Sequence, residues 1–245
     1  TKPINNPETI VPDLAESWSL DESKTNLTFK FREGVKWHDG KPFSAEDVKC
    51  TFDLLLGKSK QRLRKNPRAV WFRNLMEVTV KGPNEATFVL GKPQPAFLSL
   101  LASGYTPVYP CHVNPADMRT NPVGTGPFKF SEFKGNEVIR LVRNPDYFKK
   151  GKPLVDAIEL RIISNRSTRI LAFQAGEFDM TFSQDVTIPL LKEMVKQAPT
   201  SICEPEPNYV HRNMIVNRED EAGASCPLLQ RARQRLVQEV VDAAQ

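Results

Sequence analysis

The sequence predicts a mixed α/β (α+β) protein made of two units, and three patterns support that prediction. Segments that alternate apolar and polar residues come in pairs joined by short turns, which is typical of antiparallel hairpins. Segments with apolar residues at helical spacing interrupt these hairpins. After residue 155, helix and strand alternate. We therefore expect a domain of hairpins and helices at residues 1–152 and a second unit at residues 153–245.

Composition narrows the class of protein. The 245 residues are 40% hydrophobic and 26% charged, which is typical of a globular chain with a sizeable core. The net charge is +5, and the basic run at residues 58–68 lacks interleaved aromatic residues, so we expect no nucleic-acid partner. No apolar run reaches the length of a membrane span. The chain begins at Thr1, from which we expect a processed or excised chain.

Residues 25–49 are the most informative stretch. It opens with apolar residues that alternate with polar ones and predict a strand with one buried side, namely Leu27, Phe29 and Phe31. Asp39-Gly40 is a turn dipeptide. Ser44, with Asp47 three residues on, predicts the N-cap of a helix that runs to about Leu56.

The remaining elements follow along the chain. We expect residues 1–20 to be mostly loop, and residues 103–123 to be loop as well. The expected strands and hairpins lie at 78–90, 128–142, 158–162, 179–182 and 210–217. The expected helices lie at 95–101, 167–175, 188–197 and 227–243.

None of the motifs that carry chemistry is complete. Gly124-Thr125-Gly126 precedes a strand and lacks the Lys-Ser/Thr of a phosphate loop, so it predicts a tight backbone turn. His38-Asp39 is adjacent in a turn, and no serine nucleophile elbow accompanies it, so it predicts an exposed structural turn. Cys111-His112 has no further ligand at metal spacing. The sequence therefore predicts no catalysis, no metal and no cofactor.

The four cysteines show no CxxC spacing. Cys50 lies on the apolar side of a predicted helix, which indicates a buried thiol. Cys203 and Cys226 flank a strand-like segment, so a disulfide between them is left open.

Beyond these patterns, the chain resembles a known family. Segments 12–18, 27–32, 34–40 and 43–48 closely resemble the extracytoplasmic solute-binding proteins of peptide/nickel-type ABC transporters. Three later segments agree, at 124–128, 143–148 and 172–180, and the order and spacing match from about residue 10 to residue 217.

The resemblance implies a periplasmic-binding-protein-like fold of type II, in which two lobes close over a ligand. It also implies an incomplete chain: residues 1–152 resemble the second domain, and residues 153–245 resemble part of the ligand-binding lobe, with an atypical segment from residue 218. Because the facing lobe is largely missing, we expect weak or no ligand affinity from these 245 residues alone.

The function that the resemblance implies is the binding of peptides or a similar small solute in the periplasm or another extracytoplasmic space. The partner would be an ABC transporter permease, and contact with the membrane would occur only through it. An extracellular hydrolase and a chaperone-like interaction module remain the alternatives.

By the same resemblance, ligand-facing residues would lie in three places. They are Trp71, the loop of Ser103, Gly104 and Tyr105, and the strand around Tyr209 and Arg212. Aromatic side chains offer a rigid apolar wall, and an arginine can bind a carboxylate through two hydrogen bonds. The alternative is that Trp71 and Tyr105 belong to the domain core and that Arg212 lies on the surface of an edge strand.

Overall fold

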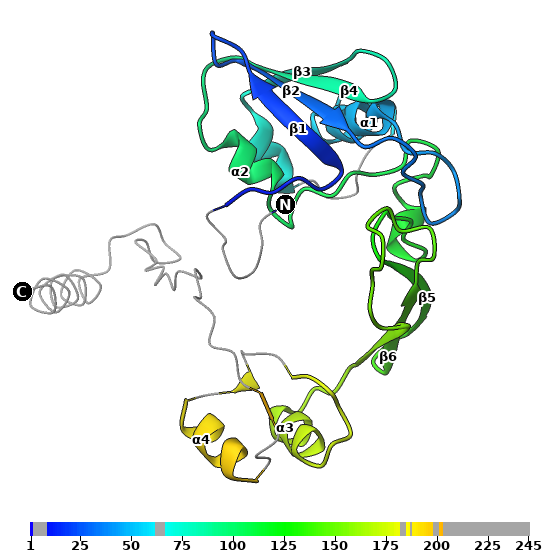
Figure 1. The fold of residues 1–245 in the computed structure, drawn as a ribbon, viewed down its shortest axis with the longest axis vertical. Helices are drawn as coiled ribbons and strands as arrows, with labels where there is room; N and C mark the ends of the chain where they lie inside the picture. Colours follow the sequence, from blue (N-terminus) through cyan, green and yellow to red (C-terminus); the bar gives the residue numbers. More distant parts are fainter. Residues whose placement is uncertain (2–8, 62–66, 182–184, 187, 198–200, 203–245) are drawn as a thin grey trace, which may run out of the picture. The chain divides into compact units, whose positions relative to one another are not determined.

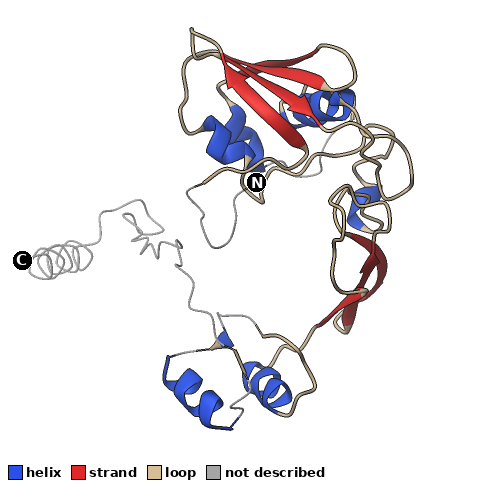
Figure 2. Cartoon of the chain, viewed as in Figure 1, coloured by secondary structure: helices blue, strands red, loops and turns tan. Residues whose placement is uncertain are grey.

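The structure is a computed structural model that describes residues 1, 9–61, 67–181, 185–186, 188–197 and 201–202. Residues 1–203 make up one compact unit. Within the described residues, strands form a four-stranded sheet in the order β1-β2-β4-β3 and a three-stranded sheet in the order β5-β6-β7 (Figures 1 and 2). Every pairing in these sheets is antiparallel, which confirms the predicted hairpins.

The first sheet consists of β1 (Ala15–Leu20), β2 (Asn26–Phe31), β3 (Leu75–Val80) and β4 (Glu85–Leu90). Its β2 strand buries the three alternating residues that the sequence singled out, Leu27, Phe29 and Phe31. On the opposite face of the sheet, the hydroxyl groups of Thr28 and Thr87 lie 2.8 Å apart in a cross-strand hydrogen bond. The period of two therefore separates a core face from an outer face.

Residues 1–20 were expected to be mostly loop, and the strand β1 at Ala15–Leu20 was not predicted. The apolar residues of this segment do not alternate, and most of its side chains are exposed. Pairing with β2 orders the strand, and its register shifts between Ala15 and Ser17. A strand at a sheet edge that is ordered by its backbone hydrogen bonds need not show alternating apolar and polar side chains, so the sequence pattern does not reveal it.

The predicted helix is α1 (Ala45–Leu55), which packs against β3 and β4. Its Asp47 carboxylate accepts a hydrogen bond from the Ser44 N–H at 3.0 Å, as a capping box requires. The helix ends before Gly57, whose φ of 73° is the left-handed conformation that glycine adopts at low cost.

Aromatic rings fill the space between α1, the sheet and α2 (Phe97–Leu101). The ring of Phe52 on α1 lies 4.8 Å from Phe88 on β4 and 5.3 Å from Phe72 at the end of the 3-10 helix η1 (Pro67–Phe72). Phe97 also contacts Phe72 and Phe88, edge to face. Such edge-to-face contacts are a favoured geometry for buried rings.

The second sheet consists of β5 (Phe128–Lys134), β6 (Val138–Arg143) and β7 (Ala157–Arg161), and the short 3-10 helix η2 (Asp117–Arg119) precedes it. Asn136 takes the left-handed conformation in the predicted turn between β5 and β6, with φ of 61°. Because β7 pairs with β6, this sheet continues across residue 152. The division at residue 152 stays a prediction.

Two helices follow, α3 (Arg166–Gln174) and α4 (Ile188–Gln197), close to their predicted ranges. Residues 179–181, which were expected to be extended, form no strand. The strand expected at 210–217 and the helix expected at 227–243 lie outside the described residues. Among the helices that the structure describes, none has both the length and the apolar character to span a membrane.

Candidate functional site

The loop predicted to face a ligand leaves the end of α2 and is held against it. Ser103 Oγ donates a hydrogen bond to the Leu100 carbonyl at 2.7 Å, and Thr106 Oγ1 donates to the same carbonyl at 3.0 Å. This carbonyl belongs to the last turn of the helix, where main-chain acceptors lack helical partners. The two hydroxyl groups therefore satisfy the helix end and fix the loop that carries Gly104 and Tyr105 between them.

Trp71 and Tyr105 meet at the surface although they are 34 positions apart in the sequence. Their ring centroids lie 6.0 Å apart with an interplanar angle of 78°, so they pack edge to face. Trp71 is 41% exposed and Tyr105 is 65% exposed. The alternative that both are core residues is therefore wrong. An exposed aromatic pair is a surface that a ligand or a partner can cover.

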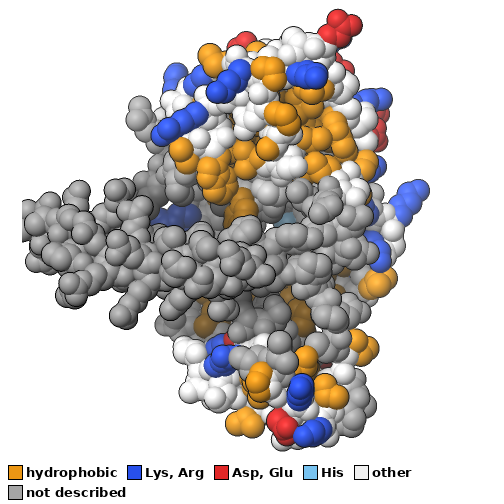
Figure 3. Space-filling model, turned by 90° about the vertical axis from the view of Figure 1, so that its left-hand side faces the viewer, with side chains coloured by type: hydrophobic (Ala, Val, Ile, Leu, Met, Phe, Trp, Pro, Cys, Tyr) orange, Lys and Arg blue, Asp and Glu red, His pale blue; other side chains and the backbone are white. Residues whose placement is uncertain are grey.

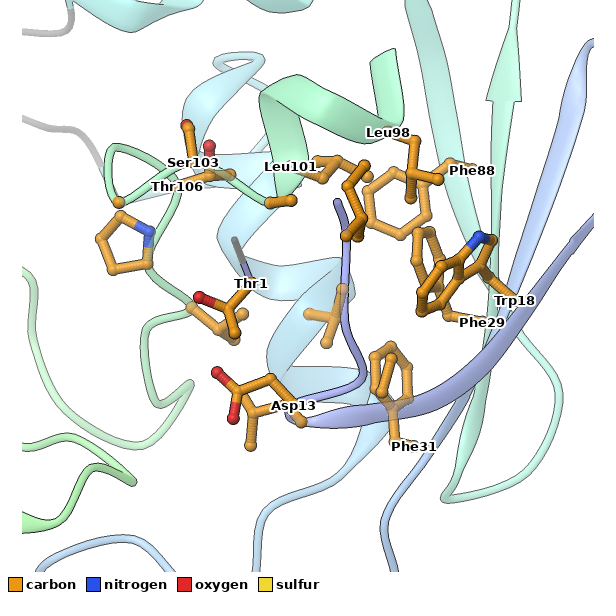
Figure 4. A pocket seen from close by; sticks show the side chains of 18 of the residues that line it. Thr1, Asp13, Trp18, Phe29, Phe31, Phe88, Leu98, Leu101, Ser103 and Thr106 are labelled. Carbon is orange, nitrogen blue, oxygen red and sulfur yellow. The ribbon is translucent and has the colours of Figure 1, made fainter. Parts of the chain in front are cut away.

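A cavity of about 410 Å³ borders the loop that carries Tyr105 (Figure 4). Its wall is largely apolar: aromatic rings come from the first sheet, and Leu98 and Leu101 come from α2. The aromatic residues from the sheet are Trp18, Phe29, Phe31 and Phe88, and α1 adds Phe52. Ser103, Gly104 and Thr106 line the same cavity, so it borders the loop that carries Tyr105.

Asp13 brings a carboxylate to this cavity (Figure 4). Lys149 Nζ lies 2.7 Å from Asp13 Oδ1. Burial would lower the pKa of Lys149, but the hydrogen bond to Asp13 raises that pKa above its ordinary value. The ammonium group stays charged and neutralises the carboxylate. The cavity wall is therefore apolar with its one carboxylate compensated, within the residues that the structure describes.

The His38-Asp39 turn has a structural role. The Gly124 N–H donates to His38 Nδ1 at 3.1 Å, so His38 Nε2 carries the proton and donates to the Gly126 carbonyl at 3.0 Å. The imidazole thus holds the Gly124–Gly126 turn through both ring nitrogens. The prediction of a structural turn agrees with this geometry, but the expectation of exposure was wrong for His38, which is half-buried.

The carboxylate of Asp39 faces a different histidine. His112 Nε2 donates to Asp39 Oδ2 at 2.6 Å. Burial would raise the pKa of Asp39, but the hydrogen bond from His112 holds that pKa below its ordinary value. No set of three or more His, Cys, Asp or Glu side chains in the described part of the chain is placed to hold a metal ion.

Of the six residues predicted to face a ligand, the structure places four. Trp71 and Tyr105 form the exposed pair, and Ser103 and Gly104 line the cavity. Tyr209 and Arg212 lie outside the described residues. Sequence reasoning missed the aromatic lining from β2 and β4, because alternation marks a residue as buried without showing that it borders a cavity.

The outer surface carries further apolar residues. Figure 3 shows hydrophobic side chains gathered on the face turned toward the viewer. Large apolar residues that are exposed around the first sheet include Leu20, Val70 and Met76, in addition to Trp71. Val70, the neighbour of Trp71 in the chain, adds exposed apolar surface next to the aromatic pair.

Comparison with known proteins identifies what this arrangement resembles. The model of the bacterial extracellular solute-binding proteins, family 5 Middle, matches residues 9–233. A Brucella ovis protein named "Putative ABC transporter peptide-binding protein" is 34% identical over 194 residues, which cover 74% of this chain and 35% of that protein. The chain therefore spans about a third of the length of this relative.

Solved structures agree on the fold. The oligopeptide-binding protein AppA of Bacillus subtilis, in complex with a nonapeptide, is 32% identical with a TM-score of 0.59, over 68% of this chain and 34% of that one. The periplasmic binding protein AgaA of A. tumefaciens R10, in complex with agropinic acid, is 27% identical with a TM-score of 0.64, over 73% and 35%. The chain thus has part of a periplasmic-binding-protein fold of type II, as predicted.

Proposed function

Because this chain belongs to the bacterial extracellular solute-binding proteins of family 5, we propose that its protein binds a peptide or a similar small solute and delivers it to an ABC transporter. The observation that carries the proposal is an apolar cavity of about 410 Å³ bordered by the loop whose Tyr105 forms an exposed aromatic pair with Trp71. A volume of this size suits a small ligand or one or two side chains of a longer one.

The chemistry of this wall favours a ligand recognised loosely through its apolar groups. Aromatic rings lose little conformational entropy on binding and can pack against side chains of different shapes. The Asp13 carboxylate is already paired with the Lys149 ammonium group, so it does not require a cationic ligand. The names of the relatives point to peptides, and the AgaA complex points to an opine-type acid as a second class of solute.

Binding without turnover is part of the proposal. A general base needs a free lone pair within reach of a substrate proton. Both ring nitrogens of His38 are engaged by the main chain of the Gly124–Gly126 turn, and Asp39 is paired with His112. His38 and Asp39 are the residues that could have served as a general base and its orienting carboxylate. Their polar atoms already make structural hydrogen bonds.

The proposed location is the periplasm or an equivalent extracytoplasmic space, and the proposed partner is the permease of an ABC transporter. Both follow from membership of a family of extracellular solute-binding proteins. Tyr209 and Arg212 remain proposed ligand residues, with Arg212 as the group that would bind a carboxylate of the ligand.

Calorimetry tests this function. The protein, in the longest form that its gene encodes, is titrated with di-, tri- and longer peptides and with opine-type acids. We expect saturable binding of one ligand class, with the ligand recovered intact by mass spectrometry after long incubation. If none of these solutes binds, the proposal is overturned. If the ligand is recovered cleaved, the proposed absence of turnover is overturned.

A further inference from the structure

Two cysteines that are far apart in the sequence share one place on the surface. Cys50 is half-buried on α1, and Cys111 is exposed in the loop between α2 and η2. Both line a depression of about 190 Å³. The sequence had indicated a buried thiol at Cys50 and had shown no relation between these two residues.

Hydrogen bonds hold the segment of Cys111 on α1. The Cys111 N–H donates to Asp47 Oδ1 at 2.9 Å, and the Tyr109 N–H donates to Thr51 Oγ1 at 2.8 Å. Asp47 and Thr51 are one helical turn apart on α1, on either side of Cys50. The loop therefore runs along the helix in a fixed register.

The side chain of Cys111 reaches the turn of α1 that precedes Cys50. Cys111 Sγ donates a hydrogen bond to the Glu46 carbonyl at 3.3 Å. Glu46 lies four residues before Cys50, and helical side chains lean toward the turn that precedes them. The Cys50 side chain is therefore directed toward the same turn of α1 that Cys111 Sγ contacts, and both side chains border the one depression.

We propose that Cys50 and Cys111 form an intramolecular disulfide. The oxidant is a disulfide, either of a dithiol oxidoreductase or of a small molecule such as oxidised glutathione. The Cys111 thiolate attacks the oxidant's S–S bond, which gives a mixed disulfide and one released thiol. The Cys50 thiolate then attacks the Cys111 sulfur and releases the second thiol. The two protons lost by the cysteines are taken up by the two released thiols.

This inference rests on the proposed extracytoplasmic location, because disulfides persist in oxidising compartments and are rare in the cytosol. The bond would close a loop of about 60 residues between α1 and the segment that follows the Ser103–Tyr105 loop. It would therefore secure the loop that carries the candidate ligand residues.

The surroundings indicate a structural disulfide rather than a reactive redox sensor. Although the residue as a whole is exposed, partial desolvation of its sulfur in the shared depression, together with the proximity of Cys50, raises the pKa of the Cys111 thiol above its ordinary value. Lys49, the nearby cation, is paired with Asp53 at 2.7 Å. The thiolate fraction at neutral pH is therefore small, and we expect oxidation to speed up as the pH rises from 7 to 9.

Peptide mapping of the 245-residue chain tests the proposal. The reduced protein is incubated with oxidised glutathione, its free thiols are alkylated, and it is digested without reduction for mass spectrometry. We expect a cross-linked peptide that contains Cys50 and Cys111. The matched variants are Cys50→Ser/Cys111→Ser and Cys203→Ser/Cys226→Ser. The cross-link should persist in the second and be absent from the first.

Thermal unfolding gives a second measurement on the same samples. Oxidation should raise the melting temperature by roughly 5 °C or more in the native chain and in Cys203→Ser/Cys226→Ser, but not in Cys50→Ser/Cys111→Ser. Alkylation of both Cys50 and Cys111 in oxidised, folded protein would overturn the proposal, as would linkage of Cys111 to Cys203 or Cys226. Neither measurement uses a ligand, so this failure is distinct from a failure of the proposed function.

Discussion

One buried carboxylate, that of Asp47, joins three parts of the chain. It is 5% exposed, and it accepts hydrogen bonds from Trp37 Nε1 at 3.2 Å, from the Ser44 N–H at 3.0 Å and from the Cys111 N–H at 2.9 Å. These donors lie in a turn, at a helix cap and in a distant loop. A residue that the sequence marks as a capping-box acid thus also fixes tertiary structure.

Replacing this carboxylate should therefore cost much more than the loss of a cap. We expect Asp47→Ala to lower the free energy of unfolding by about 3 kcal/mol, because the buried Trp37 N–H and two part-buried main-chain N–H groups lose their acceptor. Urea unfolding measures this change. The matched control is Asp53→Ala on the same helix, which removes an i,i+4 pair with Lys49 and should cost about 0.5 kcal/mol. Equal losses in the two variants would show that Asp47 acts only locally.

The aromatic pair gives a prediction about binding. If Trp71 and Tyr105 cover part of the ligand, Trp71→Ala should raise the dissociation constant of the cognate solute about tenfold or more. The free energy of unfolding should change by less than about 1 kcal/mol, because the side chain is 41% exposed. Calorimetry and urea unfolding measure the two quantities. Phe133→Ala is the control, since Phe133 is an exposed aromatic residue on β5, and an equal loss of affinity there would contradict the site.

Among the elements, α1 shows where a sequence pattern is sufficient and where it is not. Ser44, Asp47 and the apolar residues that follow locate the helix, and the alternation of β2 locates the strand on which the core is built. The edge strand β1 could not be predicted in this way, because the pairing of its backbone with β2 orders it. The meeting of Trp71 with Tyr105, and of Cys50 with Cys111, also depends on how distant loops pack on α1 and α2.

The turn of His38 gives a prediction about pH. Burial, aided by the charge of Lys129, lowers the pKa of His38 below its ordinary value of 6.5, against the effect of the hydrogen bond to Gly126. As the pH falls through 6.5, the unfolded chain therefore takes up a proton that the folded chain does not. The contribution of neutral His38 to stability is complete above pH 6.5 and is lost as the pH falls toward the folded pKa.

His38→Gln isolates this effect. Urea unfolding of both proteins at pH 7.5 and pH 5.5 should show a larger loss of stability on acidification in the native chain than in the variant. The other titrating groups are present in both proteins, so the difference between the two losses belongs to His38. An identical loss in both would mean that the folded chain protonates His38 as readily as the unfolded chain does.

For the unit as a whole, the apolar core is unevenly distributed. The main cluster of buried residues lies between Leu27 and Phe97 and includes Trp37, Phe52, Phe72 and Phe88. In α3, by contrast, Ile170 and Ala172 are buried while Leu171 is 64% exposed. Local stability follows the density of buried contacts.

Amide hydrogen exchange should therefore be slow in the first sheet and faster in α3. We expect amides of β2 and β4 to exchange at least about a hundredfold more slowly than those of α3, because their opening requires disruption of the aromatic cluster. Exchange followed by mass spectrometry measures both segments in one sample. Phe52→Ala should lower the free energy of opening of the β4 amides by several kcal/mol and leave that of the α3 amides unchanged. Equal protection of the two segments in the native chain would contradict this division.

The contact between His38 and Gly124 constrains how this family of sequences can change. A Cβ atom at position 124 would lie 3.3 Å from His38 Cε1, and loss of the imidazole would remove the acceptor of the Gly124 N–H. A substitution at either position alone is therefore unfavourable, whereas a smaller side chain at 38 makes room for a side chain at 124. We expect these two positions to covary across homologous sequences and a selection that randomises both to recover compatible pairs rather than independent residues.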